Sequence, residues 1–165
     1  MIELTTLHDA LVGEIRDLYG AEKQLLSALS RTAPQLCSAL ARDLASRLLT
    51  DTGNQLWRLE EIFTLLDEDL SQRHSLGMAR LLDRRKEPHA RVVVPVDAAF
   101  AAQAARAVHF LAAVHSTAAA RARALGYDDV AELLDETVAE ATAVSLRLAT
   151  LAPPPTLTPG AALRG

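Results

Sequence analysis

Two acidic residues occupy sequence positions that a helical bundle would bury. Glu22 lies four residues from Leu18 and four from Leu26 in the chain. Asp51 lies three residues after Leu48, within a second run of regularly spaced apolar residues. These spacings put each acid on the apolar face of an α-helix. A buried carboxylate is unfavourable unless it is paired, hydrogen-bonded or bound to a metal ion, so the two acids are the first candidates for a site.

Four long amphipathic segments are available to position these acids. Apolar residues recur in them at steps of three and four, as in helices that bury one face. Gly and Pro number seven each and aromatic residues reach only 4% of the chain, a balance that favours helix over sheet. The predicted helices run from Thr5 or Thr6 to the break at Pro34, from 35 to about 66, from about 97 to 125, and from 127 to the prolines at 153–155.

The segment between the second and third predicted helices is unusually long. Residues 67–95 hold many basic side chains beside a short apolar set, and they predict a crossover with one short helix near 75–86. One long connection between two helical hairpins is typical of ferritin-like bundles. We therefore predict an all-α, ferritin-like four-helix bundle over residues 1–152, followed by a Pro-rich, flexible C-terminal tail at 153–165.

Composition also predicts the number of domains, the kinds of partner and the compartment of the protein. With 165 residues, half of them hydrophobic, the chain suits one domain. The formal net charge of −4 argues against a nucleic-acid partner, and the lack of a long apolar run argues against a membrane-spanning segment. The N-terminus lacks the features of a signal peptide, so we expect a cytoplasmic protein. The single Cys37 cannot form an internal disulfide, and we expect it in the core.

Two motifs connect these patterns with a known family. Residues 17–25 read Asp-Leu-Tyr-Gly-Ala-Glu-Lys-Gln-Leu, and residues 51–55 read Asp-Thr-Gly-Asn-Gln. Both motifs, with shorter matches elsewhere between about residues 5 and 152, resemble the YciE/YciF family of ferritin-like bacterial proteins. The resemblance implies a ferritin-like bundle, a stress-associated role and a homodimer.

The candidate site departs from the pattern of the resembled family. The family usually has Glu-His-Tyr-Glu on its third helix, where this chain has Val-His-Phe-Leu at residues 108–111. On the second helix the family's His-Leu-Glu-Glu-Thr is replaced by Leu-Leu-Thr-Asp-Thr at 48–52. A di-metal site in such a bundle needs about four carboxylates and two imidazoles. The resemblance thus implies a reduced set of metal ligands, namely Glu22, Asp51, Glu140 and His109.

The histidines of the third predicted helix add little to this set. His109 and His115 are six residues apart, which separates them by about 120° around a helix. They are therefore poor joint ligands. His109 matches a position of the resembled family, which keeps it a candidate, although a hydrogen-bonded structural histidine is the commoner case.

Three interpretations of the acids stay open: structural residues held by hydrogen bonds, ligands of one metal ion, or ligands of two. Our leading hypothesis is a non-catalytic bundle with a degenerate di-metal site and no cofactor, which acts as a homodimer or through another protein partner. Trp57, on the polar side of the second helix, is then a candidate contact. The alternative is a metal-dependent oxidoreductase or metal-storage protein that binds Fe or Mn through Glu22, Asp51 and Glu140, with His109 as a further ligand.

Overall fold

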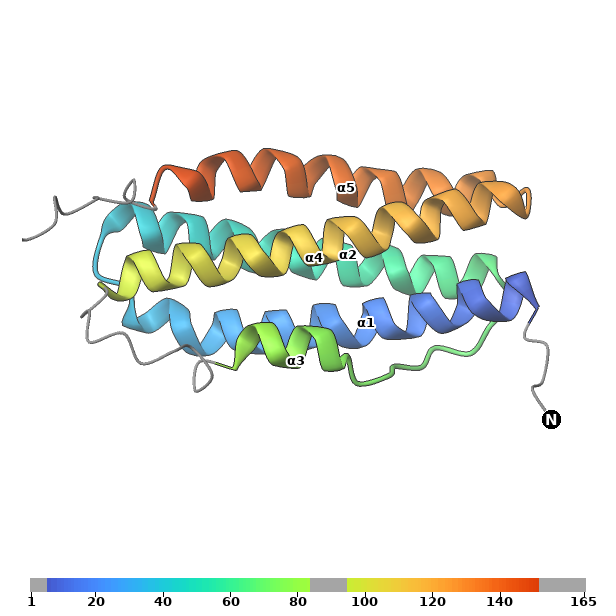
Figure 1. Ribbon diagram of the computed structural model, residues 1–165, viewed down its shortest axis with the longest axis horizontal. Coiled ribbons are helices and arrows are strands. Elements are labelled where there is room, and N and C mark those ends of the chain that lie inside the picture. The colour runs from blue at the N-terminus through green and yellow to red at the C-terminus, as the bar shows by residue number, and fades with distance from the viewer. Residues whose placement is uncertain (1–5, 84–94, 152–165) are drawn as a thin grey trace, which may run out of the picture.

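Long helices account for most of the computed structural model, which describes residues 6–83 and 95–151 (Figure 1). The described residues form four long helices, a short helix and a single 3₁₀ turn. The long helices are α1 (Leu7–Thr32), α2 (Ala39–Leu65), α4 (Val96–Ala124) and α5 (Asp128–Ala149), and the short elements are η1 (Ala33–Gln35) and α3 (Leu76–Leu82).

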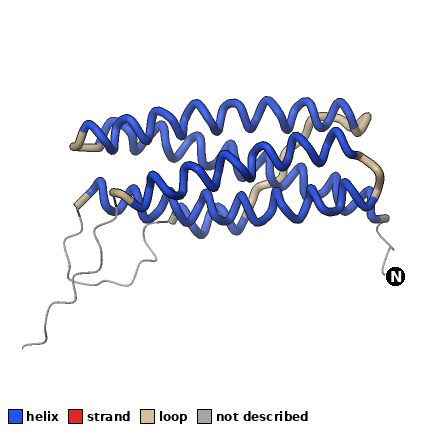
Figure 2. The backbone as a smooth tube through the Cα atoms, turned by 90° about the horizontal axis from the view of Figure 1, so that it is seen from above, coloured by secondary structure: helices blue, strands red, loops and turns tan. Residues whose placement is uncertain are grey.

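The long helices lie side by side as two hairpins joined by one crossover. Helix α1 packs against α2 and α4, and α5 packs against α2 and α4. After α2 the described part of the crossover runs back beside α1, and it includes α3, which lies against α1 and α4 (Figures 1 and 2). The predicted all-helical bundle with a helix-bearing crossover is confirmed. The tail predicted at 153–165 lies outside the described residues, as do the last residues predicted for the short helix.

Local hydrogen bonds explain where the first two long helices begin. The hydroxyl of Thr6 accepts from the amide of Asp9 at 3.0 Å, and the Asp9 carboxylate accepts from the Thr6 amide at 3.1 Å, which forms a capping box. Helix α2 begins four residues later than predicted, at a cap in which the Ser38 hydroxyl accepts from the amide of Ala41 at 3.1 Å. Asp97 of α4 supports this cap by accepting from the amides of Cys37 and Ser38 at 2.9 and 2.8 Å. The core position predicted for Cys37 is wrong, since its side chain is exposed.

Of two glycines, one in a turn and one in a helix, only the first is required by the structure. Gly126 ends the α4–α5 turn with a φ of 77°, a conformation that side-chain-bearing residues rarely adopt. Gly53 lies inside α2, yet a Cβ atom there would meet no other atom within 4 Å. No neighbouring helix therefore requires the glycine, and its cost to helix stability, about 1 kcal/mol, is not offset by close packing.

The crossover is held directly on the surface of α1. The amide of Arg73 donates to the carbonyl of Arg16 at 3.0 Å, and the Arg16 guanidinium donates to Ser71 at 2.8 Å and to Glu68 at 3.0 Å. A Cβ atom at Gly20 would lie 1.8 Å from the carbonyl oxygen of Arg73. Only glycine leaves room for this approach.

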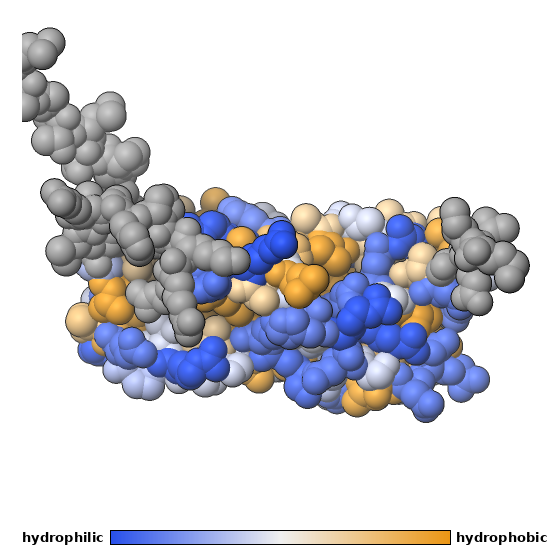
Figure 3. All heavy atoms as spheres, turned by 60° about the horizontal axis from the view of Figure 1, so that its bottom comes forward, coloured by the Kyte–Doolittle hydropathy of each residue, from blue (hydrophilic) through white to orange (hydrophobic). Residues whose placement is uncertain are grey.

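The surface is mixed in character. The face shown in Figure 3 is largely hydrophilic, with hydrophobic residues in separate small groups. None of the helices within residues 6–83 and 95–151 combines the length and hydropathy needed to cross a bilayer.

Candidate functional site

Glu22 lies at the centre of the bundle, as its spacing predicts. Its side chain on α1 is completely buried, and neither carboxyl oxygen has a hydrogen-bond partner among the described residues. The nearest basic group is on α4, where Nε2 of His115 lies 3.9 Å from Oε1 of Glu22. That distance is too long for a hydrogen bond. The two side chains are nevertheless adjacent polar groups in a core that is mainly apolar.

The hydrogen bond on the far side of His115 determines its tautomer. Its Nδ1 lies 2.9 Å from the carbonyl oxygen of Leu111, which can only accept. Nδ1 therefore carries the proton, and Nε2 faces Glu22 as an unprotonated acceptor without a partner. A protonated Glu22 is the donor that this nitrogen could use.

Burial makes both members of this pair neutral. It raises the pKa of Glu22 from 4.5 to about 8, with a further contribution from the negative charge of Glu140. Burial lowers the pKa of His115 from 6.5 to about 4, although the hydrogen bond to the Leu111 carbonyl acts to raise it. The separation of 3.9 Å would also suit an ion pair. Complete burial without other partners favours the neutral forms, because two isolated charges would be desolvated together.

Glu140 on α5 is neutralised in a different way, by Arg58 of α2. The two guanidinium ends of Arg58 donate to the two carboxylate oxygens of Glu140 at 2.9 and 2.5 Å. Arg58 also lies 3.1 Å from Glu136 through its Nε atom, and Gln55 donates to Glu140 at 3.3 Å. The hydrogen bonds from Arg58 lower the pKa of Glu140 despite its partial burial.

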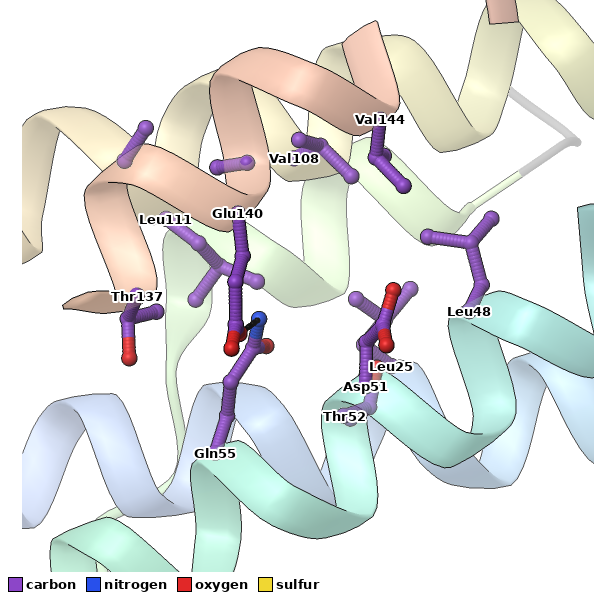
Figure 4. A pocket seen from close by; sticks show the side chains of 12 residues that line it. Leu25, Leu48, Asp51, Thr52, Gln55, Val108, Leu111, Thr137, Glu140 and Val144 are labelled. Carbon is purple, nitrogen blue, oxygen red and sulfur yellow. Dashed lines mark hydrogen bonds between the residues drawn. The ribbon is translucent and has the colours of Figure 1, made fainter. Parts of the chain in front are cut away.

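Asp51 lies at the edge of the same region and is only half-buried. Its partial burial and the charge of Glu140 raise its pKa. Figure 4 shows Asp51 and Gln55 of α2 on one side of a small cavity, with Glu140 of α5 reaching toward them. The rest of the lining is mainly hydrocarbon, contributed by Leu25, Leu48, Val108, Leu111, Ala112, Ala141 and Val144.

The cavity is too small for a bridged pair of metal ions with their ligands. Its volume is about 20 Å³, which suits about one water molecule. At the two third-helix positions where the resembled family has acids, Val108 and Leu111 present hydrocarbon to it. All the polar side chains of the lining therefore come from α2 and α5, and α1 and α4 contribute only hydrocarbon.

The structure does not bring the four predicted ligands together. Asp51 and Glu140 line the cavity, and Glu22 lies near enough to Glu140 for that charge to affect its pKa. His109 is exposed on α4 and does not line the cavity. Among residues 6–83 and 95–151, no group of three or more His, Cys, Asp and Glu side chains is arranged to hold a metal ion.

Sequence reasoning left out of the site two residues that determine the electrostatics of this region. His115 had a usable signal, because it follows Leu111 by four residues and so shares its apolar face. Arg58 had a similar signal, because it follows Asp51 by seven residues and Gln55 by three and so lies on the same face of α2.

These features define a class of protein, namely an all-helical bundle with one long crossover and acidic residues near its middle. The chain belongs to the family of DUF892, a domain of unknown function, whose family model matches residues 6–159. It is 27% identical over 158 residues to protein YciF of Escherichia coli strain K12, covering 92% of this chain and 93% of that protein. The family resemblance seen in the sequence is thereby confirmed.

Two solved structures share the fold. The first is YcfI from Rhodopseudomonas palustris, with a TM-score of 0.83 at 27% identity, over 92% of this chain and 98% of that one. The second is the crystal structure of the E. coli stress protein YciF, with a TM-score of 0.79 at 27% identity, over 90% of this chain and 95% of that one.

The raised pKa of Glu22 predicts a dependence of stability on pH. The folded protein retains a proton up to about pH 8 that the unfolded chain releases near 4.5, so Glu22 makes the free energy of unfolding fall as pH rises between these values. His115 has the opposite effect between about pH 4 and 6.5. Between pH 6.5 and 8, Glu22→Gln should therefore gain up to about 2 kcal/mol of stability relative to the wild type in urea denaturation.

Glu132→Gln is the matched control for that measurement, because Glu132 is an exposed acid on α5. Its stability relative to the wild type should be constant over the same range. Parallel pH profiles for Glu22→Gln and the wild type would show that Glu22 is already ionised in the folded protein.

The Arg58–Glu140 pair should couple α2 to α5. In a double-mutant cycle of Arg58→Met and Glu140→Gln, we expect a coupling energy of about 1–2 kcal/mol, because two charge-assisted hydrogen bonds are partly shielded from water. The comparison cycle uses Arg47 and Asp43, an exposed pair 2.9 Å apart within α2, for which about 0.3–0.5 kcal/mol is expected. Equal couplings in chemical denaturation would contradict the role given to Arg58.

Proposed function

We propose that this chain is a ferritin-like, stress-associated bundle with a degenerate di-metal site, and that it acts without catalysis through a second copy or another protein partner. One observation carries the proposal. At the middle of the bundle, the two third-helix acids of the resembled family are replaced by Val108 and Leu111, and Arg58 already neutralises Glu140.

The residues present do not fit a di-metal centre. Such a centre draws on about four carboxylates and two imidazoles, and hydrocarbon side chains supply no ligand atom. A guanidinium that holds both oxygens of Glu140 would also repel a divalent cation bound there. We therefore assign the central acids a structural role, with no Fe or Mn cofactor.

One observation favours the alternative, a metal-dependent oxidoreductase or metal-storage protein. The carboxyl oxygens of Glu22 and Nε2 of His115 are buried, adjacent and without hydrogen-bond partners, and buried polar atoms without partners are rare in proteins. A single ion held by this pair, with Asp51 or Glu140 nearby, would use them. His109 contributes least to this alternative, because it is exposed.

Support for association comes from Trp57 and from a relative. Trp57 is 64% exposed on α2, which agrees with its predicted position on the polar side of that helix. Exposed tryptophan is a common anchor in protein interfaces. YcfI from R. palustris is named as a candidate structural protein, a role that association without catalysis would serve.

Metal loading tests the absence of a cofactor. The full chain, purified without a tag, is incubated anaerobically with Fe(II) or Mn(II), desalted, and assayed for bound metal and then for oxygen consumption. We expect well below one ion per chain and no oxygen consumption above a protein-free control. Stoichiometric metal that disappears in Glu22→Gln but persists in Glu132→Gln would establish the alternative.

Substitution of Trp57 tests association. If Trp57 anchors a homodimer, Trp57→Ala should weaken dimerisation about 5- to 30-fold in sedimentation equilibrium, the effect expected for a tryptophan at the centre of an interface. Leu76→Ala is the control, because Leu76 is 70% exposed on α3, outside α2. A monomeric wild-type protein would contradict self-association, and equal effects of the two substitutions would contradict the choice of surface.

A further inference from the structure

A hollow on the outside of the bundle has a chemistry unlike that of the central cavity. It lies between α1 and the crossover, with a volume of about 440 Å³, within the size range of small-ligand sites. Its lining contains basic, amide and hydroxyl side chains and no acid, and consists of Gly20, Lys23, Gln24, Ser27, Arg31, Gln72, Arg73, His74, Ala79 and Leu82. We infer that this hollow binds a small phosphate-bearing anion, a site independent of the function proposed above.

Lys23, Ser27 and Arg31 supply the binding groups on α1. They are spaced by four residues, so their side chains follow one another along one face of the helix. Arg31 already reaches back over this face, with its guanidinium 2.6 Å from the Ser27 hydroxyl. Neither Lys23 nor Arg31 has an acidic partner within ion-pair distance in the described part of the chain. Lys23 lies over the ring of Tyr19, 5.4 Å from its centroid.

The opposite wall is held in place by main-chain contacts. Gln24 accepts from the amide of Ser75 at 3.0 Å and donates to the carbonyl of the same residue at 3.3 Å. Its amide nitrogen also lies 3.5 Å from Nε2 of His74. Together with the close approach at Gly20, these contacts fix the crossover beside α1 before any ligand arrives. A preformed site loses less entropy when it binds.

The charge of the hollow suits a dianion. Lys23 and Arg31 provide two formal positive charges, which match a phosphate monoester or inorganic phosphate at neutral pH. Arg73 is the third cation of the lining, but its Nε lies 3.5 Å from Asp17, so it is partly neutralised. Ser27 and Gln72 offer donors to the remaining phosphate oxygens.

Two observations support a compact anion in this hollow, one from a second hollow on the protein and one from the net charge of the chain. The hollow lined by Arg47 and Arg147 includes Asp43, so cations there already have an acid beside them. The chain as a whole carries a formal net charge of −4, which disfavours a long polyanion extending beyond one basic hollow.

Titration of inorganic phosphate into the full chain tests this site by NMR at low ionic strength. We expect saturable shifts of amide signals from Gly20 through Arg31 and around His74. Lys23→Gln and Arg31→Gln should each raise the Kd about two- to fivefold, since exposed charge pairs contribute modestly. Arg47→Gln, with the same loss of charge in the mixed hollow, should leave the Kd unchanged. The same titration is repeated with adenosine monophosphate. If adenosine monophosphate binds more tightly than inorganic phosphate, a phosphomonoester is the better ligand.

Three results would overturn the inference. The first is the absence of saturable shifts up to about 50 mM phosphate, well above the millimolar range of weak specific binding. The second is an equal loss of affinity in Arg47→Gln, which would indicate general charge attraction. The third is a short DNA duplex that binds more tightly than either phosphate ligand and loses affinity with Lys23→Gln and Arg31→Gln, which would assign the surface to nucleic acid.

Discussion

A carboxylate inside a helical bundle has to be neutralised, and the centre of this protein depends on that requirement. Glu22 meets it by keeping its proton, beside a His115 that is also uncharged. Glu140 meets it through the guanidinium of Arg58, and Asp51 keeps part of its surface in water. The three acids thus limit their buried charge in three different ways, although the carboxyl oxygens of Glu22 have no hydrogen-bond partner among the described residues. The same arrangement lowers the cost of placing carboxyl groups at the middle of the bundle and reduces the negative charge there.

Most of the fold could be predicted from the sequence, because its signals are local. The cap at Thr6 and the glycine stop at Gly126 depend on residues within one turn of each helix end. The cap of α2 at Ser38 is local as well, but the contact of Asp97 with the amides of Cys37 and Ser38 could not be predicted, because Asp97 is distant in the chain. The same contact, between elements remote in sequence, lies beside the exposed Cys37 that composition alone placed in the core.

The candidate site was predicted less completely, for a related reason. Spacing along one helix identified the burial of Glu22, but it says nothing about how α4 is rotated toward α1, and that rotation is what places His115 beside it. Asp51 has an equally apolar register, yet it lies at the seam between α2 and α5 and remains half-exposed. Arg58 shares the face of α2 that carries Asp51 and Gln55, but its spacing does not show that Glu140 of α5 lies opposite it.

The contact between the crossover and α1 also has a consequence for folding. Each helical hairpin joins neighbours in sequence, so its loop closes at a small entropic cost. The crossover can dock only on an α1 surface that is already formed, since Arg73 needs the carbonyl of Arg16 and the bare backbone of Gly20. We therefore expect docking to follow the formation of α1, and Gly20 is the position where one methyl group would block it.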